Sequence, residues 1–296
     1  MSDSAARDRD AARDRDAVEE KSAFAHPEVA PDRTAAYGDH PDQVVDFYAP
    51  RDGRTGVPLV VLLHGGAWRA PYDRRHVSPL AGFLARRGFA VASVEYRRGG
   101  AGAPAGEGNT AGRWPETFDD VAAAMDALPA LVARELPEAD PRRTVVTGHS
   151  AGGHLALWAA ARHVLPAGSP WRLPEPPPLR GVVALAPVAD LMTAAKLGIC
   201  SGAVHELLGG EEGFAERRPH VDPAALLPTG IATVVVQGCT DVVVPQPVAE
   251  AFVAAAAAAG ETVGLTLLDE VGHFPLIDPS ADACAVVAAE LEQLAW

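Results

Sequence analysis

Hydrophobic positions along this chain follow two alternating patterns, short runs rich in β-branched residues and longer stretches rich in alanine. The run at residues 57–63 is apolar throughout, which is typical of a strand buried on both faces of a sheet. Strands are predicted at residues 44–50, 57–63, 89–97, 143–148, 179–187, 231–238 and 262–270. Helices are predicted at residues 74–87, 116–135, 151–163, 247–259 and 281–294. Alternation repeated this often predicts an α/β fold with a mostly parallel central sheet and helices on both of its faces.

The chain divides into a short charged tail and one domain. Residues 1–35 contain the repeat AARDRD at residues 5–10 and 11–16. A segment with so few apolar residues buries too little surface to offset the entropy that it loses on ordering, so we expect a disordered tail. A marginal helix with charge pairs four residues apart is the alternative. Residues 36–296 are expected to form a single α/β domain.

Two segments of the domain lack a regular period. Residues 99–113 are rich in glycine, and residues 190–228 show no clear pattern. We expect both segments to form a small lid region over the sheet. Pro129, inside the helix predicted at residues 116–135, predicts a kink or a break, because proline removes a backbone hydrogen bond.

Composition and charge exclude several classes of partner and cofactor. The 296 residues include 25 Lys and Arg against 39 Asp and Glu, a formal net charge of −14. Such an acidic chain is not expected to bind nucleic acid or an anionic membrane, since both require basic patches. Its apolar runs are shorter than a membrane span, and its first residues do not read as a signal peptide, so a cytoplasmic protein is expected. Neither metal-ligand nor dinucleotide-binding spacing occurs, so we expect no metal and no other cofactor.

The most informative segment is Gly148-His149-Ser150-Ala151-Gly152, which matches G-x-S-x-G between a predicted strand and a predicted helix. In that context a strained turn exposes the serine as a nucleophile above the sheet. The backbone N–H of Ala151 lies in the first helical turn, where it points toward the reacting centre and adds the positive potential of the helix end.

A second motif, HGGAW at residues 64–68, directly follows a predicted strand. Its glycines allow backbone N–H groups to approach a ligand closely. We expect the N–H groups of Gly66 and Ala67 to form an oxyanion hole together with that of Ala151. A glycine turn without a ligand is the alternative. His64 is expected to be a packed, hydrogen-bonded scaffold residue.

A serine hydroxyl needs a base to take its proton, and the base needs a third group to orient it. Asp241 and His273 each follow a predicted strand, in the order serine, acid, histidine that this architecture requires. Ser150, Asp241 and His273 are therefore the predicted catalytic residues. Alternatively, Asp241 is an ordinary turn residue and His273 a surface loop residue. Asp190 is a second candidate for the orienting acid.

Other side chains near these motifs are candidates for substrate binding. Trp68 follows the oxyanion turn and is expected to narrow the acyl side of the pocket, or alternatively to pack beneath the first helix. His149, beside the nucleophile, is assigned to substrate binding because it does not have the position of the base. Trp114 is expected on the leaving-group side, whereas Trp158 is expected in the core.

HGGAW, GHSAGGHLA, the EYRR at residues 95–98 and the acid and histidine segments together resemble the esterases of the α/β-hydrolase fold. The resemblance extends from about Val44 to the C-terminus. It is strongest to the branch shared by kynurenine formamidase (arylformamidase) and small carboxylesterases. The chain departs from the HGGG and GDSAGG motifs of the hormone-sensitive-lipase branch. The resemblance implies the α/β-hydrolase fold, with Ser150 as nucleophile, His273 as base, Asp241 as its orienting acid, and Gly66 and Ala67 in the oxyanion hole.

These residues predict a serine hydrolase that cleaves a small acyl ester, or an N-formyl or aryl amide, through an acyl-enzyme. The expected partner is a small molecule with a small acyl group on an aromatic or arylamine leaving group. A catalytically silent ligand-binding protein on the same fold is the first alternative, although such proteins usually lack the nucleophile or the base. A peptidase or lipase of the superfamily is the second. No oligomeric state is predicted.

Overall fold

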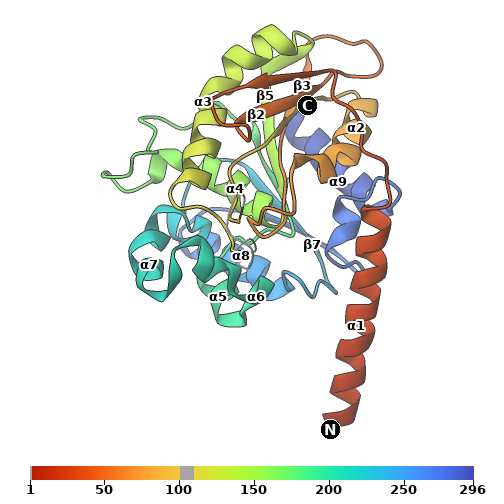
Figure 1. The fold of residues 1–296 in the computed structure, drawn as a ribbon, viewed down its shortest axis with the longest axis vertical. Helices are drawn as coiled ribbons and strands as arrows, with labels where there is room; N and C mark the ends of the chain where they lie inside the picture. The colour runs from red at the N-terminus through yellow and green to blue at the C-terminus, as the bar shows by residue number, and fades with distance from the viewer. Residues whose placement is uncertain (1, 101–109) are drawn as a thin grey trace.

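The computed structural model describes the backbone of residues 2–100 and 110–296 and the side chains of residues 11–100 and 110–296. An eight-stranded sheet in the order β1-β2-β4-β3-β5-β6-β7-β8 crosses the described part of the chain (Figure 1). Its strands are β1 (Arg33–Ala36), β2 (Val44–Tyr48), β3 (Val57–Leu63), β4 (Ala90–Val94), β5 (Ala139–His149), β6 (Gly181–Leu185), β7 (Thr233–Gly238) and β8 (Gly264–Leu268). Strand β2 is antiparallel to β1 and β4, and the remaining neighbours pair in parallel.

Helices cover both faces of the sheet because its central strands are apolar on both sides. In β3, Leu59, Val61 and Leu63 belong to one apolar core, whereas Val60 and Leu62 belong to the other. The first core is covered by α3 (Glu116–Glu135), α4 (Ala151–Ala160) and α8 (Gln246–Ala258), and the second by α2 (Ser78–Arg86) and α9 (Asp282–Ala295). The predicted α/β-hydrolase fold, with a mostly parallel sheet between two helical layers, is confirmed.

The aperiodic region at residues 190–228 forms short helices beside α8 (Figure 1). They are α5 (Leu191–Leu197), α6 (Ile199–Leu207) and α7 (Gly210–Arg217). Gly198 and Gly209 adopt left-handed φ values of 62° and 80° and end α5 and α6 after about two turns each. Helices this short explain why the sequence shows no clear hydrophobic period here. Within the other expected lid segment, 99–113, residues 101–109 lie outside the described residues. The 3-10 segments are η1 (Arg74–Val77), η2 (Arg162–Val164), η3 (Arg218–His220), η4 (Pro223–Leu226) and η5 (Phe274–Leu276).

The first 35 residues differ from the disordered tail that we expected: they contain α1 (Ser2–Ala23) and all but the last residue of the edge strand β1. The N-terminal part of α1 projects from the domain, whereas its last turns pack on it (Figure 1). There Ala23 is buried, and Ser22 Oγ donates to Asp278 Oδ2 at 2.6 Å. Contacts with a loop 256 residues away along the chain thus order a segment whose own composition does not favour burial.

Pro129 does not end α3, which continues to Glu135. Leu131 and Val132, in the turn after the proline, are buried in the first core. Their burial stabilises the helix beyond the missing hydrogen bond. In the described residues, no helix combines the length and the apolar character needed to cross a bilayer.

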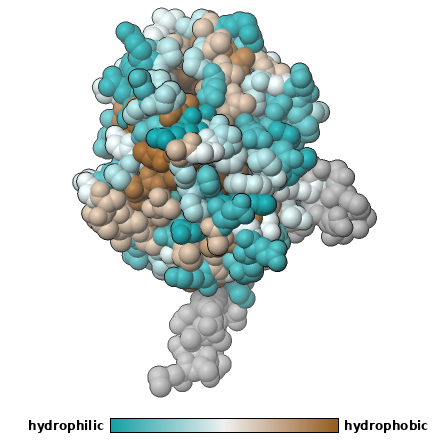
Figure 2. Space-filling view, turned by 90° about the vertical axis from the view of Figure 1, so that its left-hand side faces the viewer, coloured by the Kyte–Doolittle hydropathy of each residue, from teal (hydrophilic) through white to brown (hydrophobic). Residues whose placement is uncertain are grey.

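The side of the domain that carries α3 presents an apolar hollow. Figure 2 shows this side, where brown apolar residues gather among teal polar ones. A cavity of about 440 Å³ between α3 and the segment at residues 173–179 is lined by Met125, Leu128 and Leu179, among others. It contains none of the predicted catalytic residues.

Replacing Gly152 by alanine tests how closely β3, β5 and α4 approach one another. A Cβ at Gly152 would collide with the carbonyl oxygen of Leu63, a backbone atom that cannot rotate away. We expect the free energy of unfolding to fall by roughly 1–3 kcal/mol, as for other overpacked sites, measured by urea denaturation. Gly168→Ala is the matched control, because a Cβ there has no described atom within 4 Å. Equal stability of the two variants would contradict this packing.

Candidate active site

Ser150 occupies the sharp turn between β5 and α4, where its backbone has φ 56° and ψ −118°. Few non-glycine residues adopt a positive φ, so the turn holds the serine in a strained conformation. Its N–H donates to the carbonyl of Leu185 at 2.8 Å, and its carbonyl accepts from the N–H of His154 at 3.1 Å. A Cβ at Gly148 or Gly152 would collide with neighbouring backbone atoms. The G-x-S-x-G spacing therefore reflects the closeness of the backbone segments around the serine.

The predicted base and acid lie side by side on loops at the carboxyl edge of the sheet. His273 Nδ1 is 2.6 Å from Asp241 Oδ2, and the two side chains are 2% and 0% exposed. The other carboxylate oxygen of Asp241 accepts hydrogen bonds from the N–H groups of Val243 and Val244, both at 2.8 Å. Because the carboxylate is held as an acceptor, Nδ1 of His273 is assigned as the donor, and Nε2 is left to accept a proton.

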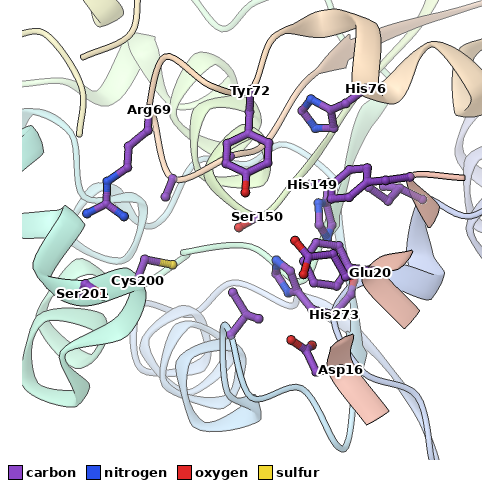
Figure 3. Close-up of a pocket in the computed structure, with 16 residues that line it drawn as sticks. Asp16, Glu20, Arg69, Tyr72, His76, His149, Ser150, Cys200, Ser201 and His273 are labelled. Carbon is purple, nitrogen blue, oxygen red and sulfur yellow. The ribbon is translucent and has the colours of Figure 1, made fainter. Parts of the chain in front are cut away.

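Ser150 and His273 line one cavity of about 340 Å³ (Figure 3). Gly66 and Ala67 of the HGGAW turn line it too. Three segments that are far apart in the sequence therefore meet at this point, as expected for loops at the carboxyl edge of parallel strands. Among the side chains that the structure describes, no group of three or more His, Cys, Asp or Glu is placed to hold a metal ion.

The HGGAW turn packs directly against Ser150. A Cβ at Gly65 would lie 2.8 Å from the carbonyl oxygen of His149 and 3.3 Å from Cβ of Ser150. Gly66 and Ala67 follow with φ values of 99° and 51°, so the backbone turns sharply beside the cavity. Among the described residues, neither N–H group donates to a backbone carbonyl. These free donors beside Ser150 support the expected oxyanion hole.

Glu95, from the EYRR motif, holds this turn from the buried side. Its carboxylate lies 2.8 Å from His64 Nε2, accepts from the N–H of Arg74 at 3.0 Å and pairs with Arg98. Tyr96 stacks on the His64 ring at 4.2 Å and donates its hydroxyl to the His64 carbonyl at 2.7 Å. Burial acts to raise the pKa of Glu95, but His64 and Arg98 outweigh it and lower the pKa to about 2. His64 is thus part of a scaffold that orients the oxyanion turn.

The structure corrects the assignment of Trp68 to the acyl side of the pocket. Its side chain is 1% exposed, does not line the cavity and packs edge to face on His154 of α4, with 5.3 Å between ring centroids. The turn presents its backbone to the cavity, so the indole packs in the core behind it.

Asp190, the alternative acid, instead caps α5 by accepting from the N–H of Thr193 at 2.7 Å.

His149 lies in the cavity wall beside His273. Its Nε2 is 3.0 Å from the His273 carbonyl oxygen, to which it donates, and the two rings are 4.3 Å apart. Burial first, and then the nearby His273, lower the pKa of His149 well below its usual range. A neutral His149 fixes the backbone that carries the base without repelling the charged form of His273.

One wall of the cavity comes from α1, which sequence reasoning did not connect with the site. Asp16, Glu20 and the adjoining Phe24 line the cavity (Figure 3 labels the first two). These three residues are four positions apart, and this spacing could have indicated from the sequence that their side chains share one face of a helix. Arg69 and Tyr72, just after the HGGAW turn, complete the opposite wall.

A model of the BD-FAE family matches residues 45–255. A probable isoprenylcysteine alpha-carbonyl methylesterase of Oryza sativa subsp. japonica is 28% identical over 265 residues, which cover 82% of this chain and 57% of that protein. The isoprenylcysteine alpha-carbonyl methylesterase of Arabidopsis thaliana is 26% identical over 263 residues, which cover 82% and 56%. The chain thus spans less than two thirds of the length of these curated relatives.

Two solved structures described as esterases have folds similar to this one. A truncated carbohydrate esterase from gut microbiota has a TM-score of 0.72 at 19% identity and covers 91% of this chain and 98% of that chain. Esterase B from Lactobacillus rhamnosis has a TM-score of 0.71 at 20% identity and covers 99% and 96%. At these identities the likeness establishes the shared fold.

Two buried histidines, His149 and His154, and the partly buried His76 predict that the fold is sensitive to mild acid. Burial is the main cause that lowers the pKa of each, to about 4 for His76 and His154. Between about pH 6.5 and 4 the unfolded chain therefore takes up protons that the folded chain excludes, so stability is complete above that window and is lost as the pH falls through it. Each histidine should remove roughly 1.4 kcal/mol per pH unit there.

Urea denaturation at pH 7, 6 and 5 measures this loss. His76→Gln should reduce the dependence of the unfolding free energy on pH by about one proton. An unfolding free energy that stays constant from pH 7 to pH 5 would contradict the prediction.

Proposed function

This chain belongs to the BD-FAE family, and from that premise we propose that it is a serine-dependent carboxylic ester hydrolase. One observation carries the proposal. Ser150, strained at the start of α4, shares a cavity with His273, whose Nδ1 is bonded to the buried Asp241 at 2.6 Å. A nucleophile, a base and an orienting acid are the groups that acyl transfer requires.

The reaction begins when Nε2 of His273 accepts the hydroxyl proton of Ser150 as the serine oxygen attacks the ester carbonyl. The electrons of the C=O bond move to its oxygen and form a tetrahedral oxyanion. Backbone N–H groups of Gly66, Ala67 and Ala151 stabilise that charge, the last with the help of the α4 helix end. Asp241 stabilises the protonated ring of His273 through Nδ1.

The tetrahedral intermediate collapses by breaking the bond to the alcohol oxygen, which takes the proton from His273 as it leaves. Water then attacks the acyl-enzyme with His273 as its base, and release of the carboxylic acid restores Ser150. One ester and one water are consumed, and one acid and one alcohol are formed.

A small ester is the substrate that the cavity and the similar proteins support best. A volume of about 340 Å³ is at the lower end for ligand pockets, which argues against a peptide or a long-chain lipid. Relatives described as methylesterases support an ester bond. Cleavage of an N-formyl or aryl amide, expected from the resemblance to arylformamidases, has no comparable support and stays a prediction. The complete set of catalytic side chains argues against a silent binding protein.

Removing the Ser150 hydroxyl tests the proposed nucleophile. Ser150→Ala should lower kcat for a short aryl acetate by roughly 10⁴- to 10⁶-fold, because no oxygen remains to form the acyl-enzyme. A fluorophosphonate probe should give one adduct, located at Ser150 by mass spectrometry. Ser201, a second serine on the cavity wall, provides the matched control, and Ser201→Ala should retain most of the activity. Unchanged turnover in Ser150→Ala would sink the proposal.

Paired aspartate variants test which carboxylate orients the base. Asp241→Asn should lower kcat by roughly 10⁴-fold, since an amide favours the wrong tautomer of His273 and does not stabilise its charged form. Asp190→Asn should have little effect, because asparagine also caps helices well. Steady-state kinetics with the same acetate compares the two variants, and a larger loss in Asp190→Asn would assign the acid to the other loop.

A further inference from the structure

Three side chains of the first helix form a stripe that faces the active-site cavity. Asp16, Glu20 and Phe24 are spaced by four residues, so they lie on one face of α1 and its continuation. The N–H of Phe24 donates to the carbonyl of Glu20 at 3.0 Å, which extends the helical geometry to the aromatic ring. Val18, between the two acids, is 69% exposed on another face.

This stripe is held on the side of the cavity that carries the base. Ser22 Oγ and His26 Nε2 bond the two carboxylate oxygens of Asp278 at 2.6 and 2.7 Å. Glu19 accepts from the N–H of Gly272, the residue before His273, at 3.3 Å. Figure 3 shows Asp16 and Glu20 beside His273. His273 must protonate the leaving group, so the leaving alcohol lies on the side of the cavity that α1 covers.

The two carboxylates form no salt bridge among the described side chains, although the nearby His273 attracts Asp16 and acts to lower its pKa. Neither Asp16 nor Glu20 takes part in an ion pair there, and Asp16 Oδ1 is buried without a hydrogen bond. Burial raises the pKa of Asp16, a sign that its charge is poorly solvated. The cavity's arginine, Arg69, is already paired with Glu206 at 3.1 Å. A buried, unpaired carboxylate oxygen is costly, and a bound cation would offset that cost.

Three aromatic rings line the same cavity as Asp16 and Glu20. The ring of Phe24 lies 5.5 Å from that of Phe274 and 6.3 Å from that of Tyr72, and all three line the cavity. Aromatic faces near carboxylates are a common arrangement for binding ammonium groups, because the rings stabilise a cation that is partly removed from water. Carboxylates and rings therefore favour the same kind of ligand.

We propose that this cavity selects esters whose leaving alcohol carries an ammonium group, held by Asp16, Glu20 and the rings of Phe24 and its neighbours. The inference rests on the proposed ester hydrolysis and adds its substrate class. Water supplies the hydroxyl of the acid and the proton of the alcohol, so the products are a carboxylic acid and an ammonium alcohol. The ammonium group itself does not react.

Two acetates of nearly equal shape test the proposal on the full-length enzyme. Acetylcholine and 3,3-dimethylbutyl acetate differ by a positive nitrogen in place of a carbon. We expect kcat/KM to be about tenfold higher for acetylcholine at low ionic strength. The ratio should decrease in about 0.5 M salt, which screens the carboxylates. A ratio at or below one would overturn the proposal.

Variants on two faces of α1 separate local recognition from the general negative charge. Asp16→Asn with Glu20→Gln should bring the ratio close to one. Asp14→Asn, an equal charge change at an exposed position of the same helix, should leave the ratio unchanged. An equal decrease in Asp14→Asn and Asp16→Asn would refute recognition by the stripe.

The outcomes also distinguish this inference from the proposed function. Hydrolysis of neither acetate by the wild-type enzyme would overturn ester hydrolysis itself, whereas hydrolysis of both without preference would overturn only the recognition of charge. If the double variant does not fold, the wild-type ratio and its salt dependence decide the question.

Discussion

Close backbone packing at the Ser150 turn is the constraint on which the rest of the site depends. Gly148 and Gly152 have no room for a Cβ, because α4 begins against the carbonyl of Leu63 at the end of β3. The same contact brings the HGGAW turn beside the serine, with Gly65 against His149. The proposed nucleophile and the proposed oxyanion donors are therefore positioned by one packing contact between two strands and a helix.

Buried carboxylates also position the site, because they hold two of its histidine side chains. Glu95 is almost fully buried, yet it stays ionised because His64, Arg98 and backbone donors surround it. Asp241 is buried under a similar set of donors and directs Nδ1 of His273. Each carboxylate fixes one histidine: Glu95 holds His64 beneath the HGGAW turn, and Asp241 holds His273, the base in the proposed mechanism.

The floor and the walls of the cavity come from different parts of the chain. The floor is made by the carboxyl edge of the sheet, where Ser150 and His273 lie. One wall comes from α1, at the opposite end of the sequence, through its attachment to Asp278 and Gly272. The sheet thus positions Ser150 and His273, whereas the first helix contributes shape and charge to the cavity wall beside them.

Periodicity and motifs alone determined the layered α/β fold, because apolar runs and helical stretches are local patterns. They also located Ser150, Asp241 and His273, since turns at the ends of parallel strands meet at one edge. The sequence left open whether Trp68 faces the pocket or packs in the core, and it did not reveal that α1 reaches the cavity. Contacts between remote segments determine the direction of a side chain after a turn. They also determine where a helix docks on a distant loop. Only the tertiary structure decides such contacts.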